Sequence, residues 1–261
     1  MQAQGYRVTL EHQAVHWWYR SRRELWLRQV DRAARALGYP ARRLDLLDYG
    51  CATGFDLPSL ARFGAAHGAD VVDAGQIAAL AGGGEPPPHG SAAFPIHRVP
   101  ADLPALRGRF HVITCLDVLE HLDDDVEGLR AIAALLAPGG QVVVTAPAYD
   151  WLWSGEDVIS AHRRRYTRET LLRAARAAGF DVLFASYFFA SVLPGVAAVV
   201  WGRRLMSNRW RAQTNLDAHP RWLGGVLRAV TTAEARLVGD ERLSLPAGTS
   251  LVCRLRLPER S

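Results

Sequence analysis

The sequence contains no lysine, so all 31 of its basic residues are arginines. This absence excludes the Gly-x-x-x-x-Gly-Lys phosphate loop, whose chemistry needs a lysine. Arginine binds phosphate and carboxylate groups in a bidentate manner, which favours recognition of anions. However, 26 acidic residues are mixed among the arginines, leaving a net charge of only +5. Because no basic stretch stands apart from acidic residues, we expect no nucleic-acid partner.

Cysteine is also scarce. Cys51, Cys115 and Cys253 lie far apart and are odd in number, which excludes a disulfide framework and a Cys-x-x-Cys metal pair. The polar N-terminal segment lacks the apolar core of a secretory signal. Together these features predict a reducing compartment and a cytoplasmic protein. The nine histidines are scattered, and none forms a His-x-x-x-His or Glu-x-x-His set with further ligands nearby, so no metal site is expected.

The length of 261 residues and the hydrophobic content of 49% suit one large globular domain with appendages. Apolar runs predict strands at residues 44–47, 69–73, 96–99, 110–116, 141–146, 181–188 and 250–257. Helical spacing, caps and breakers predict helices at residues 11–37, 57–67, 76–81, 123–136, 167–178 and 222–238. This alternation predicts an α/β fold with a mainly parallel sheet, in which a late strand can run antiparallel.

The first predicted strand leads directly into a glycine turn. Asp48 follows the apolar run, and glycines stand at positions 50 and 54 before a helix start. Such a turn lets backbone N–H groups face a ligand. Asp73, 25 residues after Asp48, either accepts hydrogen bonds from ribose hydroxyls or caps the next helix. Asp48, Asp73 and Asp117 all follow strands, so we expect them to meet at the ligand-binding edge of the sheet.

Several motifs in this order resemble those of class I S-adenosylmethionine-dependent methyltransferases. They are Asp48–Gly54, Asp73, Leu103-Pro104, Phe110–Leu116, Leu119–Leu122 and Leu136–Gly140. Three further segments are similar to a bacterial subgroup that methylates small or lipid-associated molecules. They are His16–Arg23, His162–Thr167 and Leu245–Leu251. The resemblance covers residues 11–257.

The resemblance implies a fold, a domain organisation and a cofactor. The fold is a Rossmann-like, doubly wound, mostly parallel seven-stranded sheet with the last strand antiparallel. An N-terminal helix and a helical insertion before the last strand complete it. The predicted parts are a helical cap (residues 1–40), the cofactor domain (41–188 and 243–261) and the insertion (189–242). The implied cofactor is S-adenosyl-L-methionine.

The resemblance also assigns cofactor-binding roles. The implied residues are Asp48, Tyr49, Gly50, Cys51, Ala52, Gly54, Asp73, Ala74, Asp102, Leu116 and Asp117. The glycine loop would approach the methionine part, Asp73 would hold the ribose, and Leu116 and Asp117 would border the transferred methyl group. The sequence departs from the family at Ala52, which replaces a glycine, at His111, which replaces an acid, and at the adenine site, where only Asp102 is available. Ala52 fits the loop if its φ stays negative.

Methyl transfer depends mainly on holding the acceptor in line with the methyl group, and a hydroxyl acceptor also needs a base. The catalytic candidates are His162, Tyr166 and His121, although His121 could instead be structural. The substrate-binding candidates are Trp18, Tyr19, Arg22, Trp151 and Arg165. The aromatic helix that contains Trp18 either packs on the domain or covers a ligand. The arginines at 163–165 either bind an anionic acceptor or form a solvated turn.

An apolar stretch of 18 residues, Phe184–Trp201, is interrupted by Pro194-Gly195. It reads as a buried strand followed by a packed helix, or as an interfacial helix that meets a lipid-linked acceptor. Peripheral membrane contact through residues 184–211 and a homodimer therefore stay open. The predicted function is methyl transfer to a small-molecule or lipid-linked acceptor. The alternatives are a degenerate, regulatory relative and a nicotinamide-dependent oxidoreductase, whose Gly-x-Gly-x-x-Gly spacing is absent.

Overall fold

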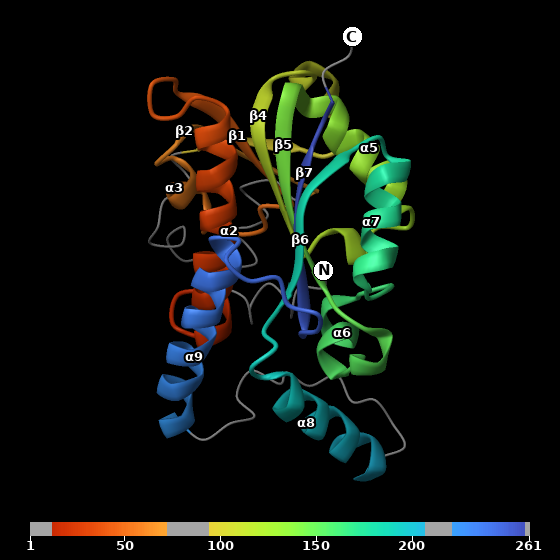
Figure 1. The fold of residues 1–261 in the computed structure, drawn as a ribbon. Helices are drawn as coiled ribbons and strands as arrows, with labels where there is room; N and C mark the ends of the chain where they lie inside the picture. Colours follow the sequence, from red (N-terminus) through yellow and green to blue (C-terminus); the bar gives the residue numbers. More distant parts are fainter. Residues whose placement is uncertain (1–11, 72–93, 207–220, 259–261) are drawn as a thin grey trace, which may run out of the picture.

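The computed structural model describes residues 12–71, 94–206 and 221–258, and these build one mixed sheet (Figure 1). Its strand order is β3-β2-β1-β4-β5-β7-β6. The strands are β1 (Leu44–Tyr49), β2 (Gly64–Asp70), β3 (Ile96–Arg98), β4 (Phe110–Leu116), β5 (Leu136–Pro147), β6 (Asp181–Phe188) and β7 (Ser250–Arg256). β7 is antiparallel to both neighbours, and the other pairs are parallel. The predicted fold class is confirmed.

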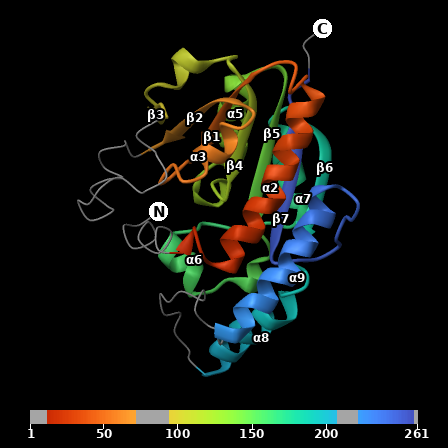
Figure 2. The same ribbon diagram turned by 90° about the vertical axis from the view of Figure 1, so that its left-hand side faces the viewer.

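Helices cover both faces of this sheet (Figures 1 and 2). The α-helices are α2 (Trp17–Ala36), α3 (Leu57–Leu60), α5 (Asp125–Leu135), α6 (Gly155–Ser160), α7 (Arg168–Ala177), α8 (Leu193–Met206) and α9 (Arg221–Gly239). Short 3-10 helices are η2 (Leu103–Leu106), η3 (Leu119–His121) and η4 (Asp150–Leu152). Helices α5 and α7 bury apolar side chains against one face, and α2, α3 and α9 do so against the other. The sheet therefore lies between two apolar layers.

Helix α2 has two functionally different halves. Its second half buries Leu25, Trp26 and Val30 at helical spacing, and these side chains join the core beneath β1 and β4. Ser21 lies 2.8 Å from Thr231 of α9 through their hydroxyl oxygens, and the two helices run side by side (Figure 2). The helix begins after His16, whose ring accepts the N–H of Trp18. Its first half extends past the sheet edge towards the site.

The region after the glycine turn differs from prediction. The helix predicted over residues 57–67 ends at Leu60, and β2 occupies Gly64–Asp70 in place of a strand at residues 69–73. A Cβ at Gly64 would lie 1.8 Å from the Leu44 carbonyl oxygen, so this segment of small residues packs closely against β1. The acid at the carboxyl end of β2 is therefore Asp70. Asp73, Ala74 and the helix predicted at residues 76–81 lie outside the described residues.

The connection from β5 to β7 contains both predicted and unpredicted elements. Helix α6 was not predicted, whereas Thr167 caps α7 as expected, through a hydrogen bond from the Thr170 N–H. After β6 the apolar stretch continues as α8, on which Val200 is buried while Leu205 is 86% exposed. In the part of the chain that the structure describes, none of the helices has the length and apolar character needed to cross a membrane.

Candidate active site

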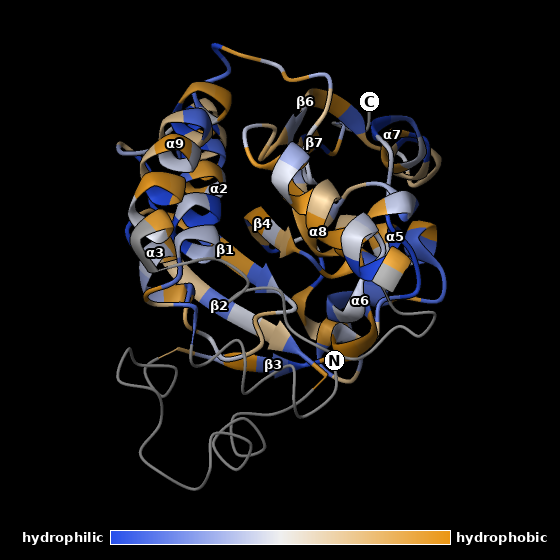
Figure 3. Cartoon of the chain, turned by 90° about the horizontal axis from the view of Figure 1, so that it is seen from below, coloured by the Kyte–Doolittle hydropathy of each residue, from blue (hydrophilic) through white to orange (hydrophobic). Residues whose placement is uncertain are grey.

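A cavity of about 320 Å³ opens at the carboxyl ends of β1, β4 and β5, the edge at which the sequence predicts a ligand. The glycine turn after β1 forms one wall and η3 after β4 forms another. The first half of α2, the segment from α6 to Arg165, and α8 complete the lining. Figure 3 views the molecule from below, with α8 and α6 drawn near the ends of the strands. Segments far apart in sequence therefore share one enclosed space.

The glycine turn is held in a left-handed backbone conformation at three positions. The φ angles are +80° at Gly50, +45° at Ala52 and +70° at Gly54. Ala52 therefore does not meet the condition of a negative φ, and its N–H donates to Asp70 at 2.8 Å. Gly50 cannot carry a side chain, since a Cβ there would lie 2.4 Å from a Val118 methyl carbon. The loop thus stores backbone strain beside the cavity.

Two carboxylates border the loop. Asp48 is buried at the end of β1 and accepts a hydrogen bond of 2.7 Å from the Thr114 hydroxyl. Burial raises the pKa of Asp48 to about 7. Asp117, after β4, accepts a hydrogen bond from Thr145 at 2.9 Å and forms an ion pair with Arg22 of α2. This ion pair joins α2 to the carboxyl end of β4. The aromatic helix therefore both packs on the domain and lines the cavity.

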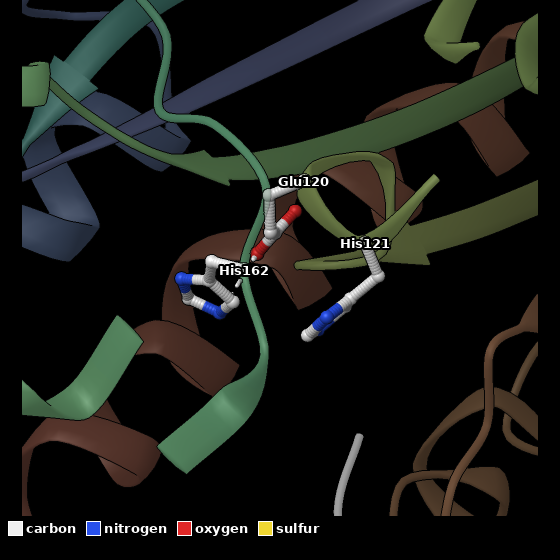
Figure 4. Close-up of side chains that lie close together, drawn as sticks. All are labelled: Glu120, His121 and His162. Carbon is white, nitrogen blue, oxygen red and sulfur yellow. Dashed lines mark ion pairs between the residues drawn. The ribbon is translucent and has the colours of Figure 1, made fainter. Parts of the chain in front are cut away.

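Another part of the cavity wall consists of Glu120 and His121 on η3 and His162 after α6 (Figure 4). The backbone N–H of Arg163 donates to the Glu120 carbonyl at 2.8 Å, which places His162 beside η3. The ring centroids of His121 and His162 are 4.9 Å apart. The His162 Nε2 atom lies 3.8 Å from a Glu120 carboxylate oxygen. Three titratable side chains therefore face one another at the cavity wall.

Asp157 orients the His162 side chain. Its carboxylate lies 2.8 Å from Nδ1 of His162 and receives two hydrogen bonds from Arg165, at 2.8 and 2.9 Å. Burial alone would raise the pKa of Asp157, but the hydrogen bonds from His162 and Arg165 lower it to about 2. Asp157 is therefore ionised at neutral pH. Its charge holds the imidazole in one orientation, with Nε2 facing Glu120.

The predicted catalytic and substrate residues separate into two groups. His121 and His162 line the cavity, as do Trp18, Tyr19, Arg22 and Arg165. The structure does not support a catalytic role for Tyr166. Its buried hydroxyl donates to Asp125 at 3.0 Å, and the residue is absent from the cavity lining that the described residues form. Trp151 is exposed and stacks on Tyr149. Trp151 is likewise absent from the lining among the described residues.

The arginines at 163–165 donate hydrogen bonds to backbone carbonyls and to Asp157. Arg163 donates to the His121 carbonyl at 3.0 Å and Arg164 donates to the Leu122 carbonyl at 2.9 Å. Arg165 is engaged by Asp157 and by the Ala148 carbonyl. The basic turn is thus a set of braces for η3 and α6. This arrangement favours neither of the predicted roles, an anion site or a solvated turn.

The predicted cofactor residues also divide. Asp48, Gly50, Cys51, Ala52, Leu116 and Asp117 line the cavity. Tyr49 is buried in the core, and Asp102 accepts a hydrogen bond from the Arg98 N–H. Neither these two nor Gly54 belongs to the lining that the described residues form. Sequence reasoning missed Glu120, although it adjoins His121 in a quoted motif. It also missed Asp157, whose only signal is its position five residues before His162.

The comparisons with known proteins agree with this geometry. A family model described as a methyltransferase domain matches residues 17–184. The chain belongs to this family, which confirms the predicted class, the S-adenosylmethionine-dependent methyltransferases, and its cofactor. A ubiquinone biosynthesis O-methyltransferase from Bordetella pertussis is 36% identical over 99 residues, which cover 37% of this chain and 40% of that protein. The chain thus spans less than half the length of this curated relative.

Solved structures share the fold at lower identity. A putative sarcosine dimethylglycine methyltransferase from Galdieria sulphuraria gives a TM-score of 0.53 at 14% identity, covering 92% of this chain and 87% of that one. A Haemonchus contortus phosphoethanolamine N-methyltransferase 2 in complex with S-adenosyl-L-methionine gives 0.50 at 16% identity, covering 97% and 60%. At these identities the likeness establishes the fold alone.

The residues at the loop fit S-adenosylmethionine. The turn brings the backbone of Gly50 to the cavity without a side chain, as a ligand that approaches the backbone closely requires. The carboxylates of Asp48 and Asp117 suit the positive charges of an ammonium and a sulfonium group. The described residues thus offer both the space and the charge that this cofactor requires.

Proposed function

We propose that this protein transfers the methyl group of S-adenosylmethionine to a hydroxyl oxygen of a small-molecule or lipid-linked acceptor. One observation carries the proposal: a single cavity is lined by the glycine loop and by Glu120, His121 and His162. Donor and acceptor can therefore meet in this one cavity. The choice of oxygen is supported by the printed name of the relative from Bordetella pertussis, an O-methyltransferase.

The loop side of the cavity positions the donor. S-adenosylmethionine supplies a methyl carbon that is already electrophilic, so alignment provides most of the acceleration. Asp48 balances the charge of the methionine ammonium group, and Leu116 and Asp117 border the methyl group at the end of β4. Asp70 keeps the loop in shape through the Ala52 N–H.

The opposite side receives the acceptor. Part of the lining is aromatic and aliphatic. It consists of Trp17, Trp18 and Tyr19 of α2, Val196 of α8, and Val192 directly before that helix. An acceptor with an apolar ring or chain fits such a lining. The bound cofactor would supply the methyl group, and the acceptor hydroxyl would release its proton towards the side chains of η3 and His162. Asp157 holds His162 in place for this step.

The affinities of two variants for S-adenosylmethionine test whether Asp73 binds the ribose. The sequence favours Asp73, whereas β2 ends at Asp70. We expect Asp73→Ala to weaken S-adenosylmethionine binding at least about tenfold, the loss of a charge-assisted hydrogen bond pair. Unchanged affinity in Asp73→Ala contradicts the ribose role of Asp73. Asp70→Asn is the comparison, because Asp70 also holds the Ala52 N–H and its loss should weaken binding whichever acid holds the ribose.

Calorimetry with three ligands tests the proposed function. We expect the protein to bind S-adenosylmethionine and S-adenosylhomocysteine and not to bind NAD. Release of S-adenosylhomocysteine should then be followed with matched acceptor pairs, each a phenol or alcohol and the corresponding amine. Turnover restricted to the hydroxyl member supports O-methylation. A protein that binds neither sulfur compound contradicts the proposal and favours the regulatory alternative, whereas turnover restricted to amines contradicts the assignment to oxygen.

A further inference from the structure

We propose that Glu120, His121 and His162 bind a divalent transition-metal ion at the cavity wall. One ligand atom from each residue lies within 4.8 Å of the other two. Figure 4 shows the three side chains gathered around a common space, with an ion pair joining Glu120 and His162. No spacing rule predicts this set from the sequence, because His162 lies 41 residues after His121. The fold brings the two segments together at the ends of β4 and β5.

The geometry needs only a small closure to hold a metal. Nitrogen and oxygen ligands bind zinc at about 2.0–2.2 Å, so two such ligands in a tetrahedral site lie roughly 3.3–3.6 Å apart. The His162 Nε2 atom is already 3.8 Å from the Glu120 carboxylate. The remaining atoms must approach by about 1 Å, which small side-chain rotations provide.

Unpartnered buried atoms point to a missing cation. Both carboxylate oxygens of Glu120 and the Nδ1 atom of His121 are buried and lack hydrogen-bond partners in the described part of the chain. Glu120 is wholly buried, and a buried carboxylate is stable when it is paired or coordinates a metal. A bound cation would favour the ionised carboxylate and the neutral imidazole that coordinate it.

The surroundings of His162 resemble the support that metal ligands receive. Its Nδ1 atom is engaged by Asp157, so Nε2 is the atom left for coordination. A carboxylate behind a metal-binding histidine fixes the ring and raises its basicity. Arg165 in turn fixes both oxygens of Asp157. This ordered carboxylate–imidazole pair aims Nε2 at the same space as Glu120.

The donor set selects the kind of metal. Two imidazole nitrogens and one carboxylate oxygen suit Zn²⁺, Mn²⁺, Fe²⁺ or Co²⁺, whereas Mg²⁺ and Ca²⁺ prefer oxygen ligands throughout. Three protein ligands leave coordination positions open, as in catalytic rather than structural sites. All three residues line the cavity, so an oxygen atom of a ligand in the cavity can complete the coordination.

The role of the metal rests on the proposed function. A hydroxyl bound to the ion has a lowered pKa and loses its proton to water before the methyl group arrives. His162 then acts as a ligand through Nε2. Without a metal, the same nitrogen would take the proton itself. The two roles are distinguishable because only one depends on the ion.

Titration of the metal-stripped protein with Co²⁺ and Zn²⁺ alone tests the site. We expect saturation at one ion per chain, with a visible Co²⁺ spectrum typical of nitrogen and oxygen ligands. Glu120→Gln and His162→Ala should each weaken binding at least about 100-fold, and Asp157→Asn about 10- to 100-fold. His111→Ala is the matched control, because His111 lies at the opposite end of β4 and bonds the Asp45 N–H. Its metal affinity should equal that of the parent protein.

Two outcomes overturn the metal site. One is a folded parent protein that binds S-adenosylmethionine but neither ion, which leaves the proposed function standing. The other is metal binding that survives both Glu120→Gln and His162→Ala. Nitrogen hyperfine coupling in the Mn²⁺-loaded parent protein reads the imidazole ligands directly, so the result does not depend on variants that fail to fold. If S-adenosylmethionine does not bind while the ion does, the proposed function fails and the metal site remains.

Discussion

The two walls of the cavity are built in opposite ways. The donor wall is one short stretch, Asp48–Asp56, in which backbone atoms and left-handed φ angles decide the shape. The acceptor wall is assembled by side chains from η3, α6 and the segment after it, held by charge-assisted hydrogen bonds to Asp157. Local chain geometry therefore sets one wall, and long-range pairing sets the other.

This difference separates two kinds of sensitivity. A change in the donor wall acts through backbone strain and close packing, so it should affect cofactor binding and stability together. A change in the acceptor wall leaves a buried charge without its partner, so the loss of stability should be greater and cofactor binding should persist. The following predictions test this distinction, from the largest expected effect to the smallest.

Asp157→Ala should have the largest effect on stability. It strips Arg165 and His162 of a wholly buried carboxylate partner, and breaking a buried pair lowers the free energy of unfolding by about 3–5 kcal/mol. Chemical denaturation measures this loss. Asp123→Ala is the matched control, because Asp123 and Arg163 form an exposed ion pair and the expected change is below about 1 kcal/mol. Equal losses in the two variants would show that the acceptor wall is not held by Asp157.

Gly50→Ala should damage the donor wall. The alanine would keep the positive φ of this position, and its methyl group would collide with Val118. The free energy of unfolding should therefore fall by about 2–4 kcal/mol. S-adenosylmethionine affinity, measured by calorimetry, should fall at least about tenfold. Gly108→Ala shares the positive φ but meets no atom within 4 Å. That control should lose about 1–2 kcal/mol of stability and keep its affinity.

Cofactor affinity should depend on pH through Asp48. Burial raises the pKa of this carboxyl to about 7, so it is increasingly protonated and neutral as the pH falls below that value. A cation favours the ionised form, and affinity for S-adenosylmethionine should therefore rise several-fold between about pH 6 and pH 7.5. Asp48→Asn removes the titrating group. An unchanged pH profile in that variant would assign the dependence to another residue.

Ala52→Gly should have the smallest effect. Ala52 has a φ of +45°, a conformation that costs an L-residue about 1–2 kcal/mol. Glycine relieves this strain but loses more backbone entropy on folding, about 0.5–1 kcal/mol. The net expectation is a gain of up to about 1 kcal/mol, or about 2–4 °C in Tm, with cofactor affinity maintained. A lower Tm would mean that the alanine methyl group contributes packing that outweighs the strain.

Much of the fold was predictable where one local signal dominates. The bounds of β4 and β6 match the predicted residues 110–116 and 181–188. The continuous apolar run of β4 specifies a buried strand, whereas β6 lies at the edge of the sheet and its first residues are partly exposed. β2 was misplaced because Gly64, Ala65 and Ala66 carry no strand preference. Close packing against Leu44 decides its position instead. Helix α6, six residues long, has too few turns for a periodic signal.

The candidate site was predictable only in part, for a related reason. The glycine turn and Asp48 are contiguous, so the local sequence indicates a ligand-binding loop. His121 and His162 were recognised as candidates, but no spacing rule links them to Glu120 or to Asp157. Their partnership arises from the backbone hydrogen bond between Arg163 and Glu120. Tyr166 was a reasonable candidate until the fold paired its hydroxyl with Asp125.

The sequence by itself determined the family, the seven-stranded sheet and the donor loop, because each depends on short-range pattern. Only the tertiary structure decided that β2 ends at Asp70, that Ala52 is strained, and that the arginines at 163–165 brace η3 and α6. It also placed Glu120, His121 and His162 around one space. These features depend on which distant segments meet, since burial removes water as a partner and each polar group must then find one within the fold.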